Sequence, residues 1–168
     1  MSYAVVRTDN MAGTDVRGQL VSVKYMGTDG QTETAIENGN VLKLGALVDG
    51  EREIYVGGNV AKDSAIDDIV LVASVETMYD ERKRNLDDFV NEAGAICRGY
   101  HIHHGDTFSV TAEALSGTGT PAKGNIVELA AGTKLAFAAS ATSGSTQVGR
   151  IIAVDVVGRY TYYVIKVN

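Results

Sequence analysis

All three histidines of the chain lie in one short stretch, which is the part of the sequence best suited to metal chemistry. The stretch reads His101-Ile102-His103-His104-Gly105-Asp106. On a strand, His101 and His103 would share a face, because side chains alternate between the two faces. With Asp106 they would offer three ligands to zinc, iron or manganese. A surface strand ending in a Gly105-Asp106 turn explains the same residues, and we favour that interpretation over a metal site.

The other reactive residues do not form a catalytic pattern. Cys97 is close to His101 in sequence, but a catalytic Cys–His pair normally comes from separate elements with a third, orienting group. We expect Cys97 to be a buried thiol. The neighbouring carboxylates Asp67-Asp68 and Asp87-Asp88 would diverge on any regular element rather than converge on a substrate. The sequence therefore predicts a protein that is not an enzyme and that needs no cofactor.

Composition limits the class of protein and its partners. The chain has 168 residues, enough for one ordinary domain or two small ones, and 45% of them are hydrophobic. A net charge of −6 argues against a nucleic-acid backbone as the partner. No apolar run approaches the ~20 residues that a membrane span needs, and the first residues lack the pattern of a secretion signal. We expect a soluble protein made in the cytoplasm, with no nucleic-acid or membrane partner.

The elements that would position these residues are mostly strands. Glycine makes up 19 residues, which indicates many tight turns. Apolar residues alternate along several segments rich in Val, Ile, Thr and Tyr. Asn38-Gly39 predicts a hairpin between residues 34–36 and 41–44, since both residues tolerate positive φ. Gly158-Arg159 predicts a second hairpin between residues 151–157 and 160–167. The fold class is expected to be mainly β.

One segment departs from this alternation. Between residues 77 and 93, apolar side chains recur with helical spacing, and charged pairs four residues apart would line the opposite side. Thr77 could cap the start, and Gly94 stands where a helix would end. We predict one amphipathic helix over about residues 77–93, lying on a sheet.

The chain also resembles itself. Gly39-Asn40-Val41-Leu42 is similar to Gly124-Asn125-Ile126-Val127, and Ile69–Ala73 is similar to Ile151–Asp155. Duplication and independent strand-forming sequences both explain this. We divide the chain into an N-terminal arm (1–12), a β-rich module (13–75), the helix (76–94) and a second β-rich module (95–168), with one merged domain as the alternative.

Three stretches resemble the head decoration, or cement, proteins of tailed bacteriophages. They are Ala35–Gly45, Met78–Lys83 and Ser145–Tyr162, and the likeness spans most of the chain. The resemblance implies β-tulip or β-barrel-like modules with an N-terminal arm on the shell. It also implies a non-enzymatic virion protein that binds the outer capsid surface and stabilises the expanded shell. Its partners would be the major capsid protein and sister copies in a homotrimer.

The family has no motif that identifies contact residues, so these are chosen from the local pattern. Tyr3 and Val5 represent the arm, and Tyr160 and Tyr162 represent the outward face of the last strand. We expect this strand to pack against a sister subunit. Two alternatives remain: another assembly component, such as a tail or head–tail joining protein, or a small metal-dependent enzyme using His101, His103 and Asp106.

Overall fold

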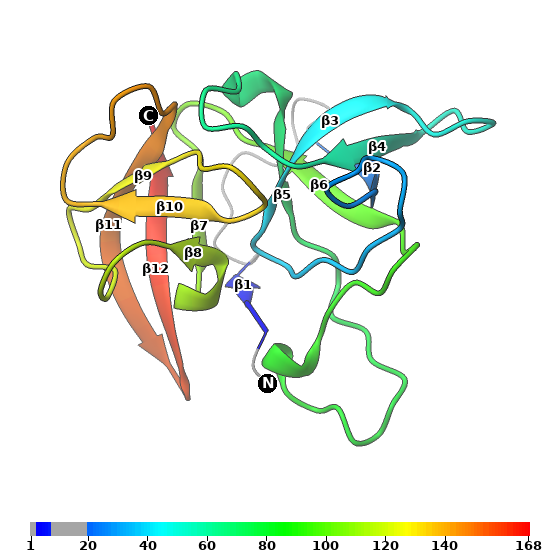
Figure 1. Cartoon of the computed structure of the whole chain (residues 1–168). Helices are drawn as coiled ribbons and strands as arrows, with labels where there is room; N and C mark the ends of the chain where they lie inside the picture. The colour runs from blue at the N-terminus through cyan, green and yellow to red at the C-terminus, as the bar shows by residue number, and fades with distance from the viewer. Residues whose placement is uncertain (1–2, 8–19) are drawn as a thin grey trace.

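The computed structural model describes residues 3–7 and 20–168. It is mainly β, with 42% of residues in strands, which confirms the predicted fold class. Figure 1 shows two sheets lying side by side. The strands are β1 Val6–Arg7, β2 Leu20–Tyr25, β3 Val41–Leu47, β4 Ile54–Gly58, β5 Ile69–Val72, β6 Cys97–His101, β7 Thr107–Val110, β8 Leu115–Ser116, β9 Ile126–Glu128, β10 Leu135–Ala138, β11 Gln147–Val157 and β12 Tyr160–Val167; the helices are short 3-10 turns, η1 Ile66–Asp68, η2 Leu86–Asp88 and η3 Ala112–Ala114.

The first sheet is a closed barrel. The order is β2-β6-β5-β3-β4, with antiparallel neighbours, and β4 returns parallel to β2 to close the ring. Glycine is required at Gly57 inside this barrel, because a Cβ there would lie 2.7 Å from side-chain carbons of Leu42 and Val23. β6 falls within the predicted second module, yet it completes the first barrel. The first unit therefore extends to His101 rather than ending before the expected helix.

The second sheet repeats this strand order. β7, β12, β11, β9 and β10 are antiparallel neighbours in the places of β2, β6, β5, β3 and β4. β10 then pairs parallel with β8, which follows β7 after the single turn η3. β7 and β8 together thus take the place of β2. β1 adds to the outer edge of β7.

The local structure at the repeated Gly-Asn sequence is also the same in both units. Gly39 N–H donates to Val72 O and Val72 N–H to Asn40 O, both at 2.8 Å; Gly124 N–H donates to Ile151 O at 2.8 Å and Ile151 N–H to Asn125 O at 2.9 Å. Both glycines have positive φ, 85° and 93°. Val72 therefore corresponds to Ile151, three positions from the alignment that the sequence suggested.

Two hydrophobic clusters explain why β5 is apolar throughout. Val70 and Val72 point into the first barrel, while Ile69 and Leu71 belong to a larger cluster shared with the second sheet. A strand buried on both faces reads as a continuous apolar run. The shared cluster joins the two sheets, and it includes Val41, Tyr100, Phe108, Val127, Leu135, Ile151 and Ile165.

The helix expected over residues 77–93 does not form. The segment is irregular except for η2, and Tyr79, assigned to the buried stripe, is 94% exposed. Aspartates bond to nearby backbone instead: Asp80 accepts from Arg82 N–H at 3.0 Å, and Asp88 accepts from Asn85 N–H at 3.0 Å. Such local bonds compete with helical ones. The extended backbone at Phe89 then ends the turn.

The Gly158-Arg159 hairpin is confirmed, but the Asn38-Gly39 hairpin is wrong. β11 and β12 pair from Val157↔Tyr160 down to Gly149↔Val167. At Asn38-Gly39 the chain does turn, yet Ile36 pairs with Asn91 and β3 pairs with β5 and β4. The turn joins two separate strand pairings because Asn38 is used as a buried hydrogen-bonding side chain.

Candidate functional site

Three of the four residues chosen as contacts lie around one cavity. Tyr3, Val5 and Tyr160 line a hollow of about 270 Å³ that also borders Asp87 and Arg159. These side chains come from the residues just before β1, from the long segment between β5 and β6, and from the β11–β12 turn with the first residue of β12. The cavity thus marks the place where three distant segments meet.

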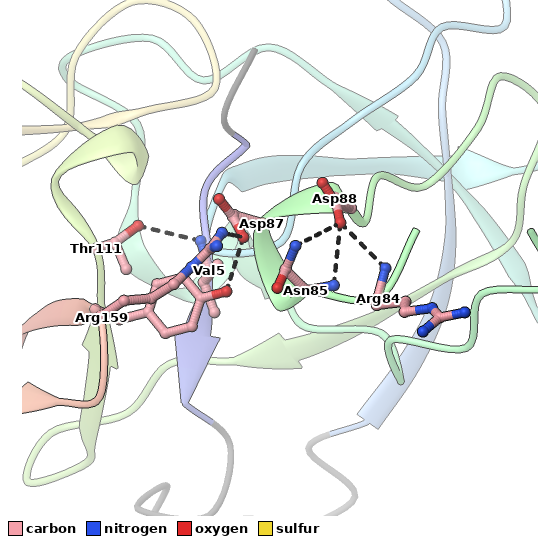
Figure 2. Close-up of polar contacts among 8 residues, drawn as sticks. Val5, Arg84, Asn85, Asp87, Asp88, Thr111 and Arg159 are labelled. Atoms are coloured by element: carbon pink, nitrogen blue, oxygen red, sulfur yellow. Dashed lines mark hydrogen bonds and ion pairs between the residues drawn. The ribbon is translucent and has the colours of Figure 1, made fainter. Parts of the chain in front are cut away.

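The N-terminal segment is held there by its backbone. Tyr3 N–H donates to Asp87 O at 3.1 Å. Val5 N–H donates to the Thr111 hydroxyl at 3.1 Å, and Thr111 N–H donates to Val5 O at 3.0 Å (Figure 2). Val5 is buried. Residues 3–7 are therefore docked on the second sheet, with Val6–Arg7 as its edge strand, while residues 1–2 and 8–12 of the expected arm lie outside the described residues.

Asp87 links this segment to the β11–β12 turn. Its carboxylate accepts hydrogen bonds from the Tyr160 hydroxyl at 2.7 Å and from the Arg159 guanidinium (Figure 2). Partial burial raises the pKa of Asp87, but the hydrogen bonds from Tyr160 and Arg159 outweigh it, and the net pKa is below the usual value. The guanidinium also lies over the Tyr160 ring, 5.0 Å from its centroid. The turn is consequently fixed by a charged contact.

The fourth chosen residue, Tyr162, lies in the interior of its own chain. Its ring is 6.1 Å from that of Tyr160, and the Arg7 guanidinium covers it at 5.4 Å from the centroid. Only 3% of Tyr162 is exposed. The expectation that it faces outward for a sister subunit is not met in the folded chain, where the Arg7 side chain lies over its ring. Tyr160 remains partly exposed.

An apolar surface that sequence reasoning did not select lies on β11. Ile152, Val154, Val156 and Val157 are all exposed, Val156 at 73%. Exposed apolar residues gathered on one element indicate a binding surface more strongly than scattered ones. The available signal was the length of the strand. β9 pairs with one side of β11 only as far as Arg150, whereas β11 itself continues to Val157, next to the β11–β12 turn. In Figure 1 the β11–β12 hairpin extends past the rest of its sheet.

The histidine stretch forms a turn after β6. His103 N–H donates to the Asp106 carboxylate at 2.9 Å, and the His103 Nδ1 atom is 3.8 Å from the same group. The rings of His101 and His103 are 6.3 Å apart, centroid to centroid. Burial, and then the neighbouring His103, lower the pKa of His101 against the opposing effect of Asp67. In the described part of the chain, no three His, Cys, Asp or Glu side chains are placed to hold a metal ion.

Cys97 is buried in the first barrel, and burial, only partly offset by a hydrogen bond involving Ser74, raises the pKa of its thiol to about 11. A thiol with that pKa is a poor nucleophile at neutral pH.

Within residues 3–7 and 20–168, no helix is long and apolar enough to cross a membrane.

No known protein family, curated protein or solved structure matches this chain. Its function has to be inferred from the residues themselves.

Proposed function

We propose that this protein is a non-enzymatic structural component of a phage particle that binds the outer capsid surface and stabilises the expanded shell. The observation that carries the proposal is the set of exposed apolar side chains on β11, which are Ile152, Val154, Val156 and Val157. An apolar surface of this kind on a projecting hairpin suits a macromolecular partner better than a small molecule. The sequence stretches similar to decoration proteins support the same function, and one of them contains β11.

The fold anchors the β11–β12 hairpin to the rest of the chain. The hydrophobic cluster shared by the two sheets joins them, and Asp87 ties the hairpin turn to the segment between β5 and β6. A hairpin held at its turn loses little conformational freedom on binding, which favours affinity. We further propose that the chain acts as a homotrimer, in which weak single contacts add through avidity.

Co-sedimentation tests the proposal. Purified protein is mixed with shells of its own phage that lack this component, in the expanded and unexpanded forms. We expect saturable binding at a fixed copy number per capsomer with preference for expanded shells, and a trimer in sedimentation velocity. Absence of binding to both forms would overturn the proposal. Binding to tail or head–tail fractions instead would favour another assembly component, and stoichiometric metal in the purified protein would favour an enzyme.

A further inference from the structure

Among the described residues, one edge of β11 has no neighbouring strand over half its length. β11 pairs with β12 along its length, but its register with β9 covers only Gln147 to Arg150, and Ile151 bonds to Gly124 and Asn125. From residue 152 to 157, the described part of the chain places no strand on the other side. An edge of this kind carries unpaired backbone N–H and C=O groups that can pair with an added strand.

The first barrel closes the equivalent edge with a side chain. Ser74, just beyond β5, donates its N–H to Asn38 Oδ1 at 3.0 Å, and its C=O accepts from Asn38 Nδ2 at 2.8 Å. The Asn38 amide thus takes the place of a strand partner. In the second unit the residue before the corresponding glycine is Lys123, which is exposed. A lysine has no acceptor and cannot make this pair of bonds, so the edge beyond Ile151 is left open.

The open edge also presents a defined pattern of side chains. Val157 and Tyr160 close the turn, which has Gly158 at φ 61°. By alternation from that pair, Val156 and Val154 direct their backbone N–H and C=O groups away from β12. Asp155 lies between the two valines, with its side chain on the opposite face. An added strand would therefore meet the apolar side chains of Val154 and Val156 on one face, and on the other the Asp155 carboxylate next to Val157.

We propose that residues 152–157 bind an extended segment of the shell subunit as an added strand, with apolar residues at alternate positions and a lysine or arginine opposite Asp155. This rests on the proposed function and names the contact. A second copy of the chain is a poorer occupant. Two antiparallel edges that used both Val154 and Val156 would set Asp155 directly against Asp155, and like charges in that position are destabilising.

Matched variants test the contact in the co-sedimentation assay with expanded shells that lack the protein. Val156→Lys places a charge on the open edge, and Val75→Lys is its control, since Val75 is also exposed but lies in the segment between β5 and β6. Asp155→Lys reverses the charge expected to face the partner, with Asp49→Lys at the exposed β3–β4 turn as the control. We expect at least tenfold weaker binding for the two edge variants and wild-type binding for both controls.

The outcomes separate this inference from the proposed function. Wild-type binding that persists in Val156→Lys and Asp155→Lys would overturn the edge contact while leaving shell binding intact. Failure of the wild type to bind any shell would overturn both. Sedimentation velocity of the free proteins gives the third result: a dimer that Val156→Lys abolishes would identify a second copy as the occupant and overturn the shell segment. Thermal unfolding midpoints of all four variants establish that each remains folded.

Discussion

Replacing Asn38 by alanine should destabilise the first barrel strongly, although the residue was expected to be an ordinary turn position. Asn38 is 1% exposed. Its amide bonds to both backbone groups of Ser74, accepts from the Asn91 side chain at 3.1 Å, and donates to a Glu76 carboxylate oxygen at 3.2 Å. It therefore connects the turn before β3, the residues after β5 and the residues before β6.

The size of the effect follows from the groups left behind. Asn38→Ala removes four hydrogen bonds and leaves the Ser74 backbone and the Asn91 amide without these partners. A typical bond contributes about 1 kcal/mol net, and a buried unsatisfied group costs about 1–3 kcal/mol. Since the Glu76 bond is near the surface, we expect a loss of about 3 kcal/mol in the free energy of unfolding. For a chain of this length that corresponds to a fall in Tm of roughly 6–12 °C.

Equilibrium unfolding in urea, followed by far-UV circular dichroism, measures this change. The control is Asn85→Ala, which removes an exposed asparagine whose amide bonds only to Asp88 at 3.0 Å. Its cost should be about 1 kcal/mol or less. The midpoint of Asn38→Ala should fall with an unchanged dependence on urea. Equal losses in the two variants would refute the idea that the Asn38 amide acts as a strand partner.

Three further results are expected. Gly149→Ala would place a Cβ 2.1 Å from Lys166 O and should lose about 2 kcal/mol of stability, whereas Gly58→Ala, with nothing within 4 Å, should be nearly neutral in urea unfolding. Asp87→Asn should be less stable than wild type near pH 7. Because the folded pKa of Asp87 is lowered, despite partial burial, by its hydrogen bonds, the difference should shrink as pH falls below about 4; a gap independent of pH would contradict this. The thiol of Cys97, with a pKa near about 11 through burial, should resist a thiol reagent at pH 8 in the native protein and react in urea; rapid native reaction would contradict its burial.

The strand content and the last hairpin were readable from sequence because both depend on short-range patterns. Alternation along residues 151–157 and 160–167, with Gly158 between them, specifies a hairpin whatever surrounds it. The continuous apolar run of β5 was also visible. That it is buried on both faces, between the barrel interior and the second sheet, depends on packing that no local pattern describes.

The errors arose where side chains compete with backbone hydrogen bonding. Apolar residues do recur with helical spacing between residues 77 and 93. In the structure, however, Asp80 and Asp88 bond to neighbouring backbone N–H groups, and Asn91 pairs with Ile36, so no helix forms. The Asn38 side chain also bonds to backbone groups, but these belong to Ser74, 36 positions away in the sequence. Asparagine and aspartate are frequent in turns because their side chains imitate backbone groups, and the sequence does not show whether that imitation is local or distant.

Three of the residues chosen as contacts lie together for a reason that can be stated. Tyr3, Val5 and Tyr160 were chosen as members of an arm and a terminal strand, and the structure brings them to one cavity. Asp87, which joins them, was expected only to diverge from Asp88, because its partner Tyr160 is separated from it by 73 positions in the sequence. Pairings over such separations are set by the topology of the two sheets.

The repeated strand order makes it possible to explain why the edge of β11 is open. If the two units were unrelated, an unpaired stretch of β11 would be one irregularity among many. Because β9, β10, β11 and β12 occupy the places of β3, β4, β5 and β6, the units can be compared strand by strand, allowing for the bulge in β11 between Ile151 and Ala153. That comparison shows the same Gly-Asn hydrogen bonds in both and an amide in place of a strand partner in only one.

Lys123→Asn would place an amide at the corresponding position. If its carbonyl and amino groups bond to the β11 backbone as those of Asn38 bond to Ser74, the variant should bind shells more weakly than Lys123→Gln, whose longer side chain does not fit that geometry.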